Sequence, residues 1–229
     1  TTPAATTTTT TTTTTAATAG TAQSLSSRGD TLTGTAGDDT FDGQLVNEGG
    51  VANVQTMTAT DTITDASTTD NDTLTIGYNT AVTPFSITNI ENITLTDQDA
   101  ATETINLVNV TGMDTLTLLA MTAAGDIDNI ANIVTLNITN NTVANNVDYV
   151  AAAVALTTDT QVINLTSHTA GTLTLDAGIE SATINSLGAV ANVMTLTAAG
   201  VATVTVTGAA GFTGTFGTVA TTIDASAAT

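Results

Sequence analysis

Aspartate and glycine recur in phase over residues 28–43, which read RGDTLTGTAGDDTFDG. Asp30 and Asp39 are nine residues apart, and Gly34 and Gly43 have the same spacing. A nine-residue unit of the form G-G-x-G-x-D-x-U-x builds a turn whose backbone carbonyls and aspartate bind Ca²⁺, followed by a short strand whose apolar residue U points inward. The spacing therefore predicts calcium-binding turns along a parallel β-roll.

The agreement with this unit is incomplete. Gly34, Gly37, Asp39 and Phe41 occupy four of its diagnostic positions, but Thr35 stands where the second glycine belongs. The pattern also decays in the next nine-residue register. We therefore expect a short calcium-binding block and not a long array.

The expected metal ligands fall into two segments. In the first, Asp30, Asp39 and Asp42 supply carboxylates, and Gly34 and Gly37 supply the turn. Clustered carboxylates suit the roughly six to eight oxygen ligands of Ca²⁺ better than the strict octahedral geometry of Mg²⁺. The alternative is that Asp-rich stretches are ordinary turns, because these side chains cap their own backbone. The second segment offers four further ligands: Asp61, Asp65, Asp70 and Asp72.

The block resembles the RTX-type calcium repeat, in particular the form found in surface-layer (S-layer) proteins of Gram-negative bacteria. Their Thr-, Ala- and Gly-rich chains carry phrases like DTLTG at 30–34 and DTF at 39–41, and the likeness extends more loosely through phrases such as IENITL at 90–95. Proteins of this kind leave the cell by type I secretion, bind Ca²⁺ and assemble into a lattice on the cell. The resemblance thus implies a secreted, self-assembling structural protein at the cell surface.

The charge balance restricts the partners. One basic residue, Arg28, faces 21 acidic residues, which gives a formal net charge of −20. Nucleic acids and anionic membranes are bound chiefly through Lys and Arg, so such a chain repels both. We expect cations and further copies of the chain as partners, in a lattice or a filament, with a cell-surface polysaccharide as an additional candidate. No apolar run approaches the roughly 20 residues of a membrane span.

Short alternating runs dominate the sequence after residue 72. Apolar residues alternate with Thr or Asn, which is the period-two pattern of strands with one buried side, and Thr makes up about a quarter of the chain. We predict an all-β fold, a right-handed parallel β-solenoid (β-helix or β-roll), with a β-sandwich as the alternative. The clearest runs are 73–76, 93–95, 105–110, 115–118, 133–138, 162–166, 172–175, 193–197 and 201–206.

The phrase Asp-Thr-Leu-Thr favours the solenoid. It begins at Asp30, Asp72 and Asp114, which are 42 residues apart each time, as expected if equivalent residues stack turn upon turn. The single candidate helix is 143–156, and its Asn and Val content makes it a poor one.

The predicted organisation has three parts. Residues 1–27 form a Thr-rich linker or stalk, because nothing in the threonine tract alternates. Residues 28–76 form the RTX-like calcium-binding region, and residues 77–229 form the body of the solenoid.

Residues for catalysis are scarce. The one histidine, His168, is expected on the surface beside a strand, and a Ser-His-Asp triad would need a carboxylate to orient it. The chain has no Trp, so the usual platforms for binding sugars are missing. We expect a structural protein and not an enzyme. A calcium-dependent adhesin repeat and an extracellular filament subunit remain as alternatives.

Overall fold

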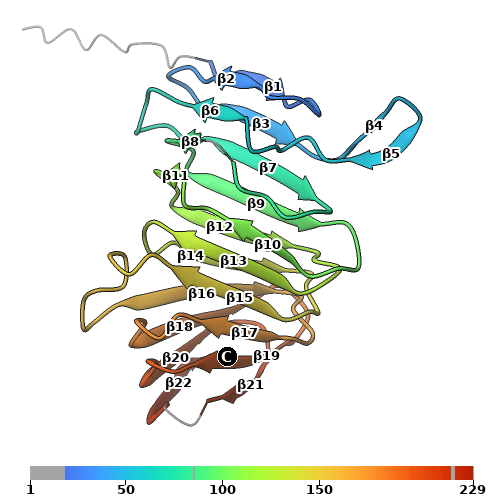
Figure 1. Cartoon of the computed structure of the whole chain (residues 1–229). Coiled ribbons are helices and arrows are strands. Elements are labelled where there is room, and N and C mark those ends of the chain that lie inside the picture. The colour runs from blue at the N-terminus through green and yellow to red at the C-terminus, as the bar shows by residue number, and fades with distance from the viewer. Residues whose placement is uncertain (1–18, 85, 218–219, 229) are drawn as a thin grey trace, which may run out of the picture.

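The computed structural model describes residues 19–84, 86–217 and 220–228. Over these residues the chain forms strands and no helix, and parallel strands stack turn upon turn into a β-solenoid (Figure 1). The predicted all-β class and the parallel solenoid are confirmed. The β-sandwich alternative fails, because the strands of every large sheet pair in parallel and not as antiparallel neighbours.

One parallel sheet runs along the whole solenoid, and each turn contributes one strand to it. Its ten strands are, in spatial order, β1 (Ala22–Ser24), β3 (Thr40–Gly43), β7 (Thr73–Tyr78), β9 (Asn92–Asp97), β12 (Thr115–Leu119), β14 (Thr135–Thr139), β16 (Thr160–Thr166), β18 (Ser181–Leu187), β20 (Thr203–Gly208) and β22 (Thr222–Ala228).

Two shorter parallel sheets complete the turns. A four-stranded sheet serves the N-terminal turns and consists of β2 (Thr31–Thr33), β6 (Thr62–Thr64), β8 (Ser86–Thr88) and β11 (Val110–Thr111). A six-stranded sheet serves the C-terminal turns and consists of β10 (Glu103–Asn106), β13 (Gly125–Ile130), β15 (Asn145–Tyr149), β17 (Thr172–Leu175), β19 (Asn192–Ala198) and β21 (Phe212–Phe216).

Columns of aliphatic side chains hold the turns together. Leu116 of β12 pairs with Ile93 on one side and with Leu136 on the other, and all three are fully buried. The neighbouring Thr115 and Thr117 point to the other side of the sheet and are partly exposed. The alternation in the sequence thus determines which side chains stack inside.

Truncation of one member of this column should destabilise the solenoid. Leu116→Ala is expected to cost about 2–5 kcal/mol of unfolding free energy, because the stacked neighbours on both sides prevent collapse of the cavity. Thr117→Ala, on the outward face of the same strand, should change the stability by less than about 1 kcal/mol. Urea unfolding followed by circular dichroism would measure both, and equal effects would contradict the assignment of the core.

An antiparallel hairpin interrupts the solenoid after β3. Strands β4 (Val46–Glu48) and β5 (Val51–Val54) are joined by Gly49 and Gly50, both with positive φ, at 58° and 84°. Two consecutive residues with positive φ are what a tight two-residue hairpin turn requires. The hairpin projects from the body (Figure 1), and Val51 is 61% exposed.

The prediction of a helix at 143–156 is wrong. Its first half is strand β15, followed by a turn at 151–154. Asn145, Val147 and Tyr149 are buried, whereas Asn146 and Asp148 between them are only partly buried, so the segment follows a period of two.

The 42-residue spacing is a structural repeat only for its last two phrases. Asp72 and Asp114 precede β7 and β12, which lie two strands apart in the ten-stranded sheet, but Asp30 precedes β2 of the four-stranded sheet. The turns differ in length, and the β4–β5 hairpin adds residues between the first two phrases. Asp72 and Asp114 therefore occupy equivalent positions two turns apart, whereas Asp30, at the same spacing in sequence, does not.

The solenoid runs across both boundaries between the three parts expected from the sequence. Residues 1–18 of the expected linker lie outside the described residues, and β1, within residues 19–27, is already a strand of the ten-stranded sheet. The boundary between residues 76 and 77 falls inside β7. In the described part of the chain, no helix has the length and apolar character needed to cross a membrane.

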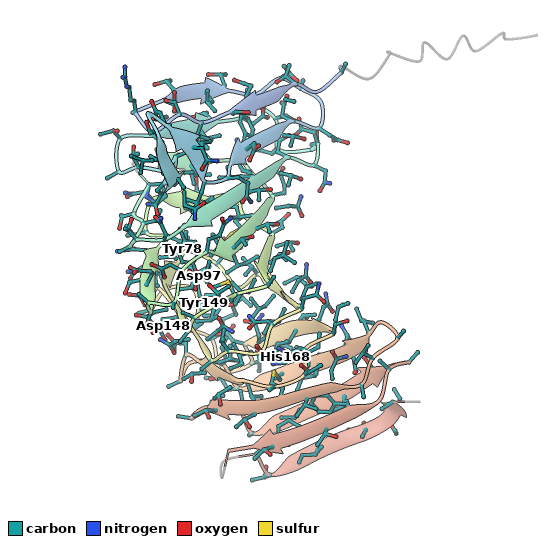
Figure 2. The ribbon with its side chains drawn as sticks, turned by 90° about the vertical axis from the view of Figure 1, so that its right-hand side faces the viewer. Tyr78, Asp97, Asp148, Tyr149 and His168 are labelled. Carbon is teal, nitrogen blue, oxygen red and sulfur yellow. The ribbon has the colours of Figure 1, made fainter. Side chains whose placement is uncertain are left out.

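His168 is buried, contrary to the expectation of a surface histidine (Figure 2). Ser167, directly after β16, has a φ of 54°, and this left-handed residue lies where the chain leaves the strand. The backbone N–H of His168 donates to Asn192 Oδ1 at 2.8 Å. Burial lowers the pKa of the imidazole, and the Asn141 backbone carbonyl opposes this only in part.

Acidification should therefore destabilise the fold through His168. Because the pKa of His168 is lowered in the folded chain, the unfolded chain binds more protons than the folded chain near and below the ordinary histidine pKa of about 6.5, so stability is lost as the pH falls. Between pH 7.5 and 5.5 the part of the loss that depends on His168 should be up to about 1 kcal/mol. Urea unfolding of the wild type and of His168→Met at both pH values would measure it, and the same pH dependence in both proteins would exclude His168 as the cause.

Candidate metal centre

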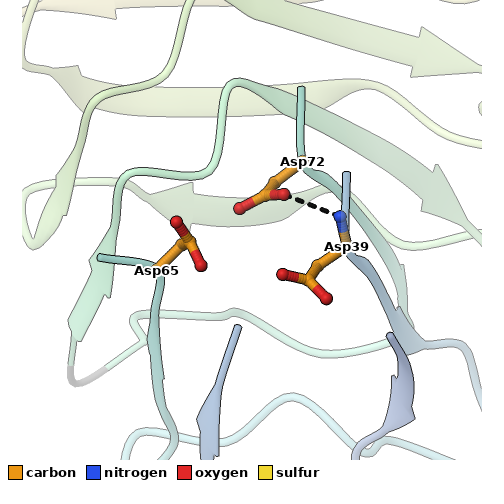
Figure 3. Close-up of side chains that lie close together, drawn as sticks. All are labelled: Asp39, Asp65 and Asp72. Atoms are coloured by element: carbon orange, nitrogen blue, oxygen red, sulfur yellow. Dashed lines mark hydrogen bonds between the residues drawn. The ribbon is translucent and has the colours of Figure 1, made fainter. Parts of the chain in front are cut away.

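Three aspartates from separate segments meet where the chain enters and leaves its strands. Asp39 directly precedes β3, Asp65 directly follows β6, and Asp72 directly precedes β7. Because β3 and β7 pair in parallel, Asp39 and Asp72 lie side by side, and the Asp39 N–H donates to Asp72 Oδ1 at 2.7 Å. Carboxylate oxygens of all three lie within 4.8 Å of one another (Figure 3).

The three side chains are buried and share the same charge. Asp39 and Asp65 are 1% exposed and Asp72 is fully buried. Two like charges about 4 Å apart repel by about 4 kcal/mol at an effective dielectric constant of about 20. The one Lys or Arg of the chain, Arg28, is exposed. Such a cluster requires either protons or a cation.

Two carboxylate oxygens of the cluster accept no hydrogen bond. Asp39 Oδ1 accepts from Thr21 Oγ1 at 2.6 Å, and Asp39 Oδ2 accepts from the Thr35 N–H. Burial alone would raise the pKa of Asp39, but these hydrogen bonds outweigh it and the pKa is lowered, so Asp39 is a stable carboxylate. By contrast, Asp65 Oδ1 and Asp72 Oδ2 are buried with no hydrogen-bond partner. An unpaired buried oxygen of a charged group is costly unless a cation binds it.

Asp72 is the most strongly perturbed acid of the group. Burial is the largest cause that raises its pKa to about 6, and the nearby charges of Asp65, Asp70 and Glu91 raise it further. Its hydrogen bond from the Asp39 N–H acts in the other direction but is too weak to compensate. Proton and cation therefore compete for Asp72.

Gly34 provides the space that the cluster occupies. A Cβ atom at this position would lie 2.3 Å from Asp65 Oδ1 and 2.7 Å from Asp39 Oδ2. Both distances are shorter than any ordinary contact, so a larger residue would displace the carboxylates. The glycine that the nine-residue pattern singled out is thus needed here for close approach.

A second acidic group shares Asp72. Oxygens of Asp70, Asp72 and Glu91 lie within 4.8 Å of one another, and both carboxylate oxygens of Asp70 are buried without a hydrogen-bond partner. Glu91 directly precedes β9, and its Oε2 accepts the Asp72 N–H at 2.9 Å. The sequence reasoning did not select Glu91. An alignment of Glu91-Asn-Ile-Thr with Asp72-Thr-Leu-Thr would have found it, since these residues occupy equivalent positions in paired strands.

Asp30 and Asp61 form a different arrangement at the four-stranded sheet. The Asp30 N–H donates to Asp61 Oδ1 at 2.7 Å, and Asp61 Oδ2 accepts the Thr58 N–H at 2.6 Å. The Asp30 carboxylate accepts the Ser26 N–H at 2.6 Å. Burial raises the pKa of Asp61. Both carboxylates are used as caps of turns, and neither belongs to a group of three acidic side chains among the described residues.

Asp42 belongs to neither acidic group, and Gly37 lies in the turn that leads to Asp39, as expected. Asp42 is exposed on the outward face of β3 and accepts the Gln44 N–H at 3.0 Å. Gly37 is buried in the turn between β2 and β3, where its N–H donates to Thr35 Oγ1 at 3.4 Å. Of the nine residues selected from the sequence, the structure brings together Gly34, Asp39, Asp65, Asp70 and Asp72.

A third acidic group lies on the six-stranded sheet. Asp126, Asp128 and Asp148 are partly exposed, and burial together with the two neighbouring charges raises the pKa of Asp128. Asp126 accepts hydrogen bonds from Thr104 Oγ1 at 3.3 Å and from Asn146 Nδ2 at 2.9 Å, and Asn146 also donates to Asp148. With these partners and with access to water, the group has little need of a cation.

The buried groups match a hard cation. All their side-chain ligands are carboxylates, which suit Ca²⁺, Mg²⁺ or Mn²⁺ and not the softer metals that prefer Cys and His. The ligands come from successive turns, so a bound cation would join these turns to one another. Comparisons of the chain with protein-family models, with curated proteins and with solved structures found no match.

Proposed function

We propose that this chain is a structural segment of a bacterial surface layer, which acts outside the cell, folds with the help of Ca²⁺ and assembles with further copies of itself. The observation that carries the proposal is the buried group of Asp39, Asp65 and Asp72, in which two oxygens have no partner. The resemblance of residues 30–43 to RTX repeats of surface-layer proteins supports the choice of cation and of location.

The position of the group favours a structural role for the cation. The carboxylates are enclosed between consecutive turns, where a cation bridges β3, β6 and β7. A catalytic metal keeps an open coordination position for its substrate, whereas a structural metal is enclosed by protein ligands. Binding of such a cation contributes directly to the free energy of folding.

Calcium also links folding and assembly to export. Extracellular calcium modules have dissociation constants of about 10⁻⁴ to 10⁻³ M, so the cation loads outside the cell and not in the cytosol. Without it, mutual repulsion of the carboxylates opposes closure of the N-terminal turns. Copies of a chain with a net charge of −20 also repel one another, and divalent cations weaken that repulsion.

The test is a calcium titration of the full chain. Circular dichroism reports folding, light scattering reports assembly, and electron microscopy of the product reports its shape. We expect strand content, thermal stability and scattering to rise together at about millimolar Ca²⁺, with Mg²⁺ at the same concentration much less effective. Sheets support a surface layer. Fibres would indicate a filament subunit, and monomers that bind a cell-surface polysaccharide would indicate an adhesin. Identical folding and assembly in chelator would contradict the calcium mechanism.

A further inference from the structure

The geometry points to a second cation beside the first, so that Asp72 is shared by two ions. The first would be bound by Asp39, Asp65 and Asp72, and the second by Asp70, Asp72 and Glu91. This inference rests on the proposed calcium-dependent fold and adds a paired site to it. The second position lies outside the nine-residue repeat pattern.

The stacking of the strands places three of these acids in a row. Asp39, Asp72 and Glu91 each occupy the position directly before a strand of the ten-stranded sheet, and the first residues of those strands, Thr40, Thr73 and Asn92, pair in register. Neighbouring strands are about 4.7–4.9 Å apart, so the three acids follow one another at about this spacing.

Backbone N–H groups bind one oxygen of Asp72 and one oxygen of Glu91, and the other oxygen of Asp72 stays without a partner. The Asp39 N–H donates to Asp72 Oδ1 at 2.7 Å, and the Asp72 N–H donates to Glu91 Oε2 at 2.9 Å. These bonds orient the carboxylates along the row. Asp72 Oδ2 is fully buried and has no partner, so it is the oxygen that can bridge two ions.

The loop between β6 and β7 adds one further acid to each position. Asp65 belongs to the group with Asp39, and Asp70 belongs to the group with Glu91. Asp65 Oδ1 and both oxygens of Asp70 are buried without a partner. Each proposed position therefore has its own unpaired oxygen in addition to the shared one.

One ion is too small to serve all five carboxylates. Ca²⁺ binds its oxygen ligands at about 2.3–2.6 Å, so two ligands of one ion are at most about 5 Å apart. Oxygens within 4.8 Å of one another occur in each group of three, but no such group combines Asp39 or Asp65 with Asp70 or Glu91. Charge leads to the same result, because five carboxylates with one Ca²⁺ retain three negative charges, whereas two ions leave one.

Substitution of the shared residue, Asp72, should reduce the number of bound ions more than substitution of a ligand of one position alone. In calcium titrations by calorimetry and native mass spectrometry of the full chain, Glu91→Gln should bind one ion fewer than the wild type, and Asp65→Asn should also bind one fewer. Asp72→Asn should bind two fewer. Glu103→Gln, on β10 and outside both groups, is the matched control and should bind as many ions as the wild type.

Lanthanide luminescence on the wild type tests the distance between the two bound ions without any substitution. Eu³⁺ bound at one position should show a shortened excited-state lifetime when Nd³⁺ occupies the other, because energy transfer requires close neighbours. An Eu³⁺ lifetime that Nd³⁺ does not shorten would overturn the paired site. A Glu91→Gln chain that binds as many ions as the wild type would overturn it as well. In both cases calcium-dependent folding would stand. If Asp72→Asn bound as many ions as the wild type, the metal centre of the proposed function would itself be contradicted.

Discussion

Asp65→Asn is expected to stabilise the chain in chelator and to destabilise it in Ca²⁺, relative to the wild type. In chelator the substitution removes one of three buried like charges, which repel by up to about 4 kcal/mol per pair at 4 Å, and we expect a net gain of about 2 kcal/mol. In Ca²⁺ it removes a ligand, so most of the stabilisation by the ion is lost. For a chain of this size, 2 kcal/mol corresponds to a shift of about 4–8 °C in Tm.

Thermal unfolding in EGTA and in 5 mM CaCl₂, followed by circular dichroism, would measure both effects. Asn preserves the shape of the side chain and can still accept the Ser67 N–H at its remaining oxygen, as Asp65 Oδ2 does. Glu103→Gln serves again as the control and should leave both Tm values unchanged within about 1 °C. A shift of the same sign in both conditions would mean that Asp65 acts on packing and does not bind a cation.

Gly34→Ala is expected to abolish most of the calcium response by steric displacement alone. The added methyl group would lie 2.3 Å from Asp65 Oδ1 and 2.7 Å from Asp39 Oδ2, so at least one carboxylate must move. We expect the calcium affinity to fall at least about tenfold, which is about 1.4 kcal/mol. The stability in chelator should change much less, since displacement of one carboxylate also relieves repulsion.

The matched control for this substitution is Gly217→Ala, where the nearest heavy atom to the added Cβ lies at 3.8 Å, an ordinary contact distance. Calcium titration calorimetry on the two variants and on the wild type gives the comparison. If Gly34→Ala bound calcium as tightly as the wild type, the cation could not lie between Asp39 and Asp65.

The alternation of Thr with Leu and Ile was sufficient to predict the class of fold. In runs such as 73–76 and 115–118, a period of two specifies a strand with one apolar side. Almost no apolar residue is aromatic, so the columns inside the solenoid consist mainly of aliphatic side chains of similar size, which stack in register from turn to turn. The same alternation is expected in any fold that buries one side of each strand.

The metal ligands depended on information that lies outside the local pattern. The sequence indicated Asp39 and Gly34 through their spacing, and Asp65, Asp70 and Asp72 through their density, but it placed Asp30 and Asp42 beside Asp39 as the first expected ligands, ahead of the second segment. Only the pairing of β3 with β7 places Asp39 next to Asp72, and only the pairing of β7 with β9 adds Glu91.

The sequence by itself thus determined the all-β class, most of the strands and the acidic character of the N-terminal turns, and it favoured the parallel solenoid over a β-sandwich. The tertiary structure alone decided which acids meet, which ones merely cap turns, and that His168 points inward. The physical reason is that register is fixed by the stacking of inward side chains, whereas the loops between strands can change in length at little entropic cost. Residues 33 apart, such as Asp39 and Asp72, therefore become neighbours through stacking, and no spacing in the sequence records that contact.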